Sequence, residues 1–184
     1  MKATEQLRDE HEAAKLMLRI LERAAARLES GQDVSHDDLA QILAFITGFL
    51  DSCHHAKEEE HLFPALEEAG IPREGGPIGM MLKEHDMGRG YVEGMRDAIA
   101  LYASGDRAAM PRIAEHAGRY VRHLAQHIEK ENMVLFPMAD AHLSPETQER
   151  LIKDFDRLEH EKIGAGRHDE FHRMLHRLKG LYPD

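Results

Sequence analysis

Two histidine–glutamate pairs that recur in matching sequence contexts have the spacing with which a helix can chelate a metal ion. His54 precedes Glu58 by four residues, and His127 precedes Glu131 by four residues. Residues four apart on an α-helix project from the same face, about one turn apart. Each pair can therefore offer one imidazole nitrogen and one carboxylate oxygen to a single point, provided that both stretches are helical.

The two pairs belong to a longer internal repeat. The segment HHAKEEEHLFP at 54–64 aligns with HIEKENMVLFP at 127–137 at an offset of 73 residues, and six of the eleven positions are identical. The identical positions are the histidine, a lysine, the glutamate and a closing Leu-Phe-Pro. Upstream, a Glu-His pair at 10–11 recurs at 84–85. The chain therefore reads His, HxxxE, His, HxxxE, which indicates a duplicated helix pair.

The repeat predicts a buried centre with two metal ions. An unpaired polar group in a protein core costs on the order of a few kcal/mol, and an unpaired carboxylate costs more. Two divalent ions bridged by both glutamates, with the histidines as terminal ligands, would satisfy every one of these groups. The predicted ligands are His11, His54, Glu58, His85, His127 and Glu131.

Four helices must bring these residues to one level. Apolar residues follow alternating steps of four and three from Leu7, as in a helix that faces a bundle core, and His11 lies within this pattern. Glycine, proline and serine separate four such stretches, at 4–29, 36–69, 78–104 and 107–142. Short connections favour antiparallel packing. We therefore expect an all-α, antiparallel up-down four-helix bundle over residues 1–143.

The remaining residues, 144–184, are expected to form a helical extension packed on the same domain. Ser144 and Pro145 make a good helix start, and two helices are predicted, at 145–163 and 167–179. Three histidines there, at positions 168, 172 and 176, recur every four residues along one face. They indicate either a solvated face or an extension that folds over the bundle and supplies His160 or Glu161 as a ligand or gate.

Three other histidines are weighed as possible ligands of the centre. His55 adjoins His54 and would point about 100° away on an α-helix, so a role beside the centre or at the surface is weighed against a seventh ligand. His123 lies one turn before His127, but leucine occupies the matching repeat position. His61 follows Glu58 by three residues, and its repeat mate is Val134. For both, packing or hydrogen bonding is preferred over ligation.

Ligation by nitrogen and oxygen without thiolate suits iron, manganese, cobalt or zinc. A ferritin-like carboxylate site would need ExxH on two helices, and only Glu58 to His61 has that spacing. The motifs resemble the hemerythrin-like HHE cation-binding family over about residues 5–140. This resemblance implies two non-haem iron ions with an oxo or hydroxo bridge, and a small diatomic or peroxide ligand such as oxygen, peroxide or nitric oxide.

The resemblance leaves several roles open. Sensing, scavenging or stress defence is one class, in which Tyr102 and Tyr120 on the inner face are candidates for hydrogen bonding to a bound ligand. Iron storage, donation or repair of iron centres is a second class, and a structural zinc bundle is a third. Oxygen-carrying hemerythrins use five histidines and two carboxylates. The four histidines of this repeat therefore argue against reversible oxygen carriage.

Composition excludes other classes of protein. The net charge is −10, and the 24 Lys and Arg are dispersed among 34 acidic residues, so we expect no nucleic-acid partner. No apolar stretch has the length of a signal peptide or a membrane span, so we expect a cytoplasmic protein without a membrane partner. Cys53 is the single cysteine and cannot form an internal disulfide. The oligomeric state is left open.

Overall fold

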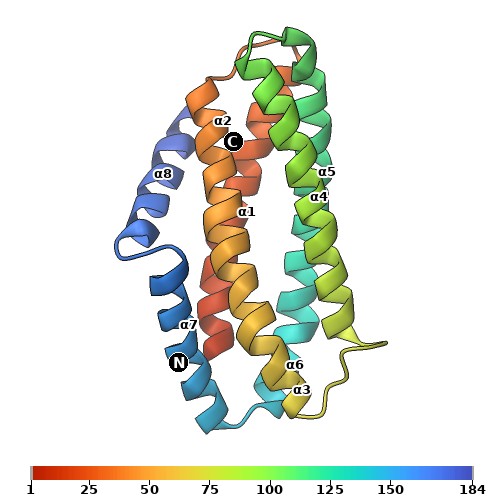
Figure 1. Ribbon diagram of the computed structural model, residues 1–184, viewed down its shortest axis with the longest axis vertical. Coiled ribbons are helices and arrows are strands. Elements are labelled where there is room, and N and C mark those ends of the chain that lie inside the picture. The colour runs from red at the N-terminus through yellow and green to blue at the C-terminus, as the bar shows by residue number, and fades with distance from the viewer. Residues whose placement is uncertain (1, 184) are drawn as a thin grey trace.

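Four long helical segments lie side by side in the computed structural model, which describes residues 2–183 (Figure 1). Their connections lie at alternating ends of the molecule (Figure 1). No strand occurs in this described range, and no helix in it is long and apolar enough to cross a membrane. The first segment is α1 (Ala3–Glu29), and the third is α4 (Pro77–Ala103). The second segment consists of α2 (His36–Ala44), η1 (Phe45–His55), η2 (Glu58–Leu62) and α3 (Phe63–Glu68). The fourth consists of η3 (Arg107–Ala109), α5 (Met110–Lys130), η4 (Glu131–Leu135) and α6 (Phe136–His142).

The segment ends follow the local sequence signals closely. Gly31 and Gly105 have φ of 80° and 101°, the left-handed conformation that glycine adopts most easily after a helix. Pro77 occupies the first turn of α4, where its missing N–H costs nothing. The Asp106 side chain accepts a hydrogen bond from the Ala108 N–H at the start of η3. Each boundary of the four segments lies within one residue of the boundary predicted from the sequence.

The apolar faces of the segments form two separate clusters. The larger one joins α1, α2, η1, α4, α5 and the last helix of the chain, and it includes Leu21, Phe45, Met95 and Ile113. The smaller one lies at the other end of the bundle and includes Leu7, Phe63 and Phe136. All six predicted ligands are buried but belong to neither cluster. A polar layer therefore crosses the bundle between two apolar cores.

The second and fourth segments contain π-helical stretches at the polar layer. Glu58 begins η2 and Glu131 begins η4, and each stretch is followed by a Phe-Pro pair. Proline lacks an N–H and collides with the carbonyl four residues back, so an unmodified α-helix would be broken there. A wider turn is one way to accommodate such an interruption. The chain therefore continues as a helix beyond Pro64 and Pro137.

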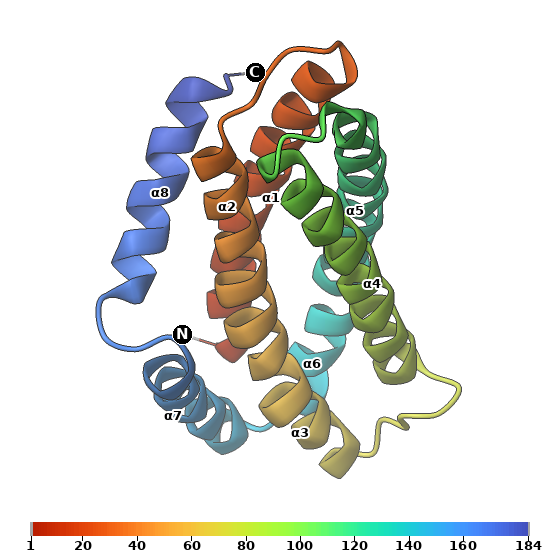
Figure 2. The ribbon, with the colours of Figure 1, turned by 45° about the horizontal axis from the view of Figure 1, so that its top comes forward.

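Two further helices, α7 (Pro145–Lys162) and α8 (Arg167–Leu181), pack against the bundle on the side of α1 and α2 (Figure 2). The Ser144 side chain caps α7 by accepting a hydrogen bond from the Thr147 N–H. Gly164 and Gly166, both at φ 82°, separate the two helices. Phe171 and neighbouring leucines of α8 join the larger apolar cluster. The proposed division of the chain at residue 143 stays a prediction.

Candidate metal centre

The six predicted ligands come together in the polar layer in two groups that share one carboxylate. In each group the potential ligand atoms lie within 4.8 Å of one another. The groups are His11, His54, Glu58 and Glu131 on one side, and His55, Glu58, His85 and His127 on the other. Every member is at most 7% exposed. The centre therefore holds two adjacent candidate cation positions.

Each glutamate directs one oxygen towards each group. Glu131 Oε2 lies 3.1 Å from His11 Nε2, and its Oε1 lies 3.2 Å from His127 Nε2. Glu58 Oε1 lies 3.7 Å from His54 Nε2, and its Oε2 lies 3.4 Å from His85 Nε2. Such an orientation is the one that a carboxylate bridging two cations requires.

His55 is the residue that the ligand prediction left open. Its ring stacks on that of His85 with the centroids 4.0 Å apart, and it brings the number of histidines in the two groups to five. His55 ends the π-helical segment η1. A wider turn rotates each residue by less than the roughly 100° of an α-helix, so His54 and His55 both face the bundle interior. The expectation against reversible oxygen carriage rested on four histidines, and the structure brings five together.

The two glutamates are buried with their carboxylate oxygens free of hydrogen bonds to the described residues. None of the four oxygens of Glu58 and Glu131 makes a hydrogen bond within the described chain, although both side chains are fully buried. Burial, followed by the charge of Glu131, raises the pKa of Glu58 well above its usual range. Unpaired buried oxygens opposite imidazole nitrogens are the donor set of a metal centre, so these residues fit two divalent or trivalent ions.

Groups outside the centre hold the histidines of the first group. His54 Nδ1 lies 2.7 Å from Glu10 Oε2, and His11 Nδ1 lies 2.9 Å from Asn132 Oδ1. Lys57, fully buried, donates to Glu10 Oε1 at 2.5 Å. A ring nitrogen held in this way fixes the tautomer and directs Nε2 towards the metal position.

The second group is held by the corresponding residues of the repeat. His127 Nδ1 lies 2.9 Å from Glu84 Oε2, and Lys130 also pairs with Glu84. His85 Nδ1 lies 2.6 Å from Glu59 Oε1. Glu59 is the repeat mate of Asn132, which contacts His11 Nδ1 in the first group. This shared arrangement explains why the Glu-His pair and the lysine both recur in the repeat. Each glutamate orients the histidine of the helix opposite, and the lysine neutralises that glutamate.

His55 has no histidine counterpart in the repeat and uses a different support. Its Nδ1 lies 3.3 Å from Asp51 Oδ1. Arg89 donates from Nε to the same Asp51 oxygen at 2.9 Å and from a terminal nitrogen to Glu59 at 2.7 Å. The hydrogen bonds with His55 and Arg89, which outweigh burial, lower the pKa of Asp51 to about 2. Arg89 therefore connects the carboxylates that orient His55 and His85.

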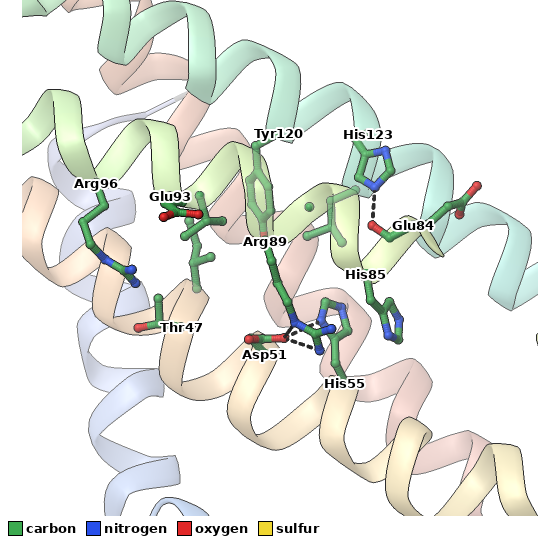
Figure 3. Close-up of a pocket in the computed structure, with 14 residues that line it drawn as sticks. Thr47, Asp51, His55, Glu84, His85, Arg89, Glu93, Arg96, Tyr120 and His123 are labelled. Atoms are coloured by element: carbon green, nitrogen blue, oxygen red, sulfur yellow. Dashed lines mark hydrogen bonds and ion pairs between the residues drawn. The ribbon is translucent and has the colours of Figure 1, made fainter. Parts of the chain in front are cut away.

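A cavity of about 220 Å³ adjoins the second group. His55 and His85 form its inner wall, and Arg89 and Tyr120 lie along its sides (Figure 3). Figure 3 shows Tyr120 extending from α5 into this space. Its side chain is only 2% exposed, and no partner for its hydroxyl is found in the described range. Gly88 also lines the cavity, so the missing side chain contributes to the open space.

Other candidates lie away from the metal positions. His123 donates from Nε2 to the Glu84 carbonyl at 2.7 Å, and half-buried His61 packs near Phe155. His160 and Glu161 are exposed on α7, so neither supplies a ligand or gate. Instead their neighbour Glu159 accepts a 2.8 Å hydrogen bond from Lys57. The Tyr102 hydroxyl donates to Asp33 and to the Val34 carbonyl, outside the polar layer.

Comparison with known families finds one match that covers most of the chain. The model of the hemerythrin HHE cation binding domain matches residues 2–139. This range contains both candidate metal positions and ends before α7. No solved structure matches the chain significantly.

Several curated proteins are similar to the chain at low identity. An uncharacterized protein of Mycobacterium tuberculosis is 26% identical over 162 residues, which cover 88% of this chain and 63% of the relative. The iron-sulfur cluster repair protein YtfE of Dickeya chrysanthemi is 31% identical over 106 residues, 56% of this chain and 42% of the relative. That of Musicola paradisiaca is 31% identical over 134 residues, 71% and 60% respectively. The chain spans less than two thirds of each of these relatives.

Proposed function

Since the chain belongs to the hemerythrin HHE cation-binding family, we propose that it is a non-haem di-iron protein whose centre binds or reacts with a small oxidant. Dioxygen, peroxide and nitric oxide are the ligand class. The bundle is of the antiparallel up-down four-helix type, and it contributes five histidines and two glutamates to the two ions. Sensing, scavenging or defence against oxidants is the corresponding role.

The observation that carries this proposal is the set of four unpaired carboxylate oxygens facing the imidazole nitrogens. Glu58 and Glu131 would bridge the two ions, because each directs its oxygens to both groups. His11 and His54 would complete one position, and the other three histidines the second. Imidazole and carboxylate together suit iron, and the family supports that choice over zinc.

The surroundings of the second position favour a small ligand from solution. When bound, two adjacent iron ions supply redox chemistry and a Lewis-acid position for a ligand oxygen or nitrogen. The cavity reaches His55 and His85 and holds a volume suited to a few atoms. The Tyr120 hydroxyl offers a hydrogen-bond donor at its wall. Beside the first position, buried Lys57 is instead hydrogen-bonded to Glu10 and Glu159.

A second candidate function is delivery or repair of iron centres. It is favoured by the printed name of the relatives from Dickeya chrysanthemi and Musicola paradisiaca, iron-sulfur cluster repair protein. In that role loss of iron to an acceptor would be the activity. Mixing the iron-loaded protein with an apo iron-sulfur protein or with an oxidant distinguishes the two functions. A donor releases its iron to the apo protein, whereas an oxidant-binding protein keeps both ions while its spectrum changes.

Metal analysis with matched variants tests the main proposal. Protein purified from cells grown without added metal should contain about two irons per chain and show near-ultraviolet absorption that changes with peroxide or oxygen. Glu58→Ala and Glu131→Ala should lose both ions and retain most of their helix content. Glu60→Ala, an exposed neighbour that pairs with Lys162, is the control. One zinc per chain, or full iron in either glutamate variant, would contradict the proposal.

The cytoplasmic location and the absence of a nucleic-acid or membrane partner stay predictions.

A further inference from the structure

We propose that His168 and His172 bind one divalent transition-metal ion at the surface of α8, separately from the di-iron centre. The two Nε2 atoms lie 2.8 Å apart, and the ring centroids lie 4.7 Å apart. Two histidines four residues apart on one helix face are a recurrent chelating pair. Here both rings already direct the same nitrogen towards a common point.

The contact between the two rings is one that a metal ion can replace. A neutral imidazole carries one N–H donor and one acceptor nitrogen, so one Nε2 must carry a proton when the two nitrogens are in contact. When a cation binds both nitrogens, that ring carries its proton on Nδ1 instead, so each Nε2 offers a lone pair to the cation. Small rotations of both side chains are enough to open the space, because both rings lie at the surface.

Glu159 orients His168 from the other side of its ring. Glu159 Oε1 lies 2.9 Å from His168 Nδ1, and Glu159 Oε2 accepts a 2.8 Å hydrogen bond from buried Lys57. Metal-binding histidines commonly have such a carboxylate on the second ring nitrogen, which fixes the tautomer and raises the basicity of the first. The pair therefore resembles a prepared site more than two independent surface histidines.

The site is open to solvent on one side and supported on the other. His172 is exposed, and the His168 side chain is 35% exposed. The ring of buried Phe49 lies 5.4 Å from that of His168 and 6.3 Å from that of His172, which limits how far either can turn inward. Water can fill the remaining coordination positions, as in sites with few protein ligands.

The chemistry of the pair selects the class of ion. Imidazole nitrogen suits zinc, copper, nickel and ferrous iron, whereas calcium and magnesium prefer oxygen ligands. The formal net charge of −10 favours any cation near the surface. This site shares no ligand with the di-iron centre, since Glu159, Lys57 and Glu10 lie between His168 and His54.

Calorimetric titration of the iron-loaded protein with Ni²⁺ tests the proposal. We expect one Ni²⁺ to bind per chain while the iron content stays constant. His172→Ala and His168→Ala should each weaken the dissociation constant at least about tenfold, because one of two nitrogen ligands is lost. Glu159→Gln should weaken it by about tenfold through the orientation of His168.

His176→Ala is the matched control: His176 lies one turn further along α8, and no hydrogen bond or ring contact joins it to the pair in the described residues. It should leave Ni²⁺ binding unchanged. No Ni²⁺ binding beyond the iron centre, equal affinity in His172→Ala, or equal loss in His176→Ala would overturn the proposal. The iron content of His172→Ala is measured separately and reports on the di-iron centre. Failure of the surface site on α8 can therefore be distinguished from failure of the di-iron proposal.

Discussion

Lys57 donates a hydrogen bond to Glu159, 102 residues further along the chain, and so ties the C-terminal extension to the polar layer of the bundle. The same ammonium donates to Glu10, the acceptor of His54 Nδ1. Its repeat mate Lys130 pairs with Glu84 in the same way, but its side chain is 45% exposed. The extension therefore covers one half of a duplicated centre and leaves the other half close to solvent.

Glu159→Gln should destabilise the metal-free protein by about 1–2 kcal/mol, because a buried ammonium loses one of its two charged acceptors while Glu10 remains. Urea unfolding at neutral pH measures this change. Glu161→Gln removes an exposed carboxylate two positions away on the same helix and should change stability by less than about 0.5 kcal/mol. Equal stability of the two variants would show that the tie between Lys57 and Glu159 contributes nothing.

The contribution of Glu159 should also depend on pH. The ion-pair contact with His168, followed by the hydrogen bond from Lys57, lowers the pKa of Glu159 to about 2, although burial acts against it. A carboxyl whose pKa is lower in the folded state stabilises the fold above its unfolded pKa and loses that effect as the pH falls towards the folded value. The stability difference between the metal-free wild type and Glu159→Gln should therefore be full between about pH 5 and 6.5 and shrink towards pH 2. It should also fall at higher pH, because Glu159 raises the pKa of His168 above its usual 6.5 and that contribution is lost when His168 gives up its proton.

Glu10→Gln should weaken iron retention by about 10- to 100-fold, because His54 loses the carboxylate that orients its ring and raises its basicity. Competition with a chelator, followed by iron analysis, measures the effect. Glu12→Gln is the control, since Glu12 is exposed on the same helix and pairs with Lys15. Glu84→Gln should act in the same way through His127, because it is the repeat mate of Glu10. Unchanged retention in both variants would rule out this orienting role.

Much of this architecture could be predicted from the sequence because each half of the repeat contains the same apolar spacing and the same ligand motif. The four segments follow from the apolar spacing, and the duplicated motif singled out six residues that the structure brings together. The roles of Glu10 and Lys57 could not be predicted from the repeat alone. Both recur in the repeat, but their partners lie on another helix, and only the packing of that helix decides which ring each glutamate reaches.

His55 and Glu159 could not be predicted for different reasons. The direction of His55 depends on the π-helical turns of η1, and its repeat mate is the apolar Ile128, so neither α-helical spacing nor the duplication pointed to it. Glu159 lies outside the repeat, and its role depends on how α7 packs on the bundle. In both cases the deciding information is a local change of helix geometry or a tertiary contact.

His55→Ala should lower the iron content towards about one ion per chain, because the position formed by His55, Glu58, His85 and His127 loses a ligand while the other is intact. Iron analysis and the near-ultraviolet spectrum measure the change. His123→Ala is the control: this ring lines the same cavity but bonds to the Glu84 carbonyl. If His55→Ala retained two irons, His55 would pack beside the centre without binding metal.

Gly88→Leu should slow the reaction with peroxide without removing iron, because Gly88 lines the cavity that reaches His55 and His85. A Cβ at this position would lie 3.7 Å from His123 and 3.8 Å from Tyr120, which is ordinary contact, so the larger side chain extends into the open space. A leucine side chain there would obstruct the way to His55 and His85. We expect the rate, measured by stopped-flow absorbance, to fall by about tenfold, which corresponds to about 1.4 kcal/mol of added barrier.

Gly90→Leu is the matched control on the same helix, because nothing lies within 4 Å of a Cβ added there. Both substitutions replace glycine in a helix and should gain similar helix propensity, up to about 1 kcal/mol. They differ only in whether the new side chain enters the cavity. A slower reaction in Gly88→Leu alone, at equal iron content, identifies the cavity as the route to the second metal position. Equal rates in the two variants would mean that oxidants reach the centre from elsewhere.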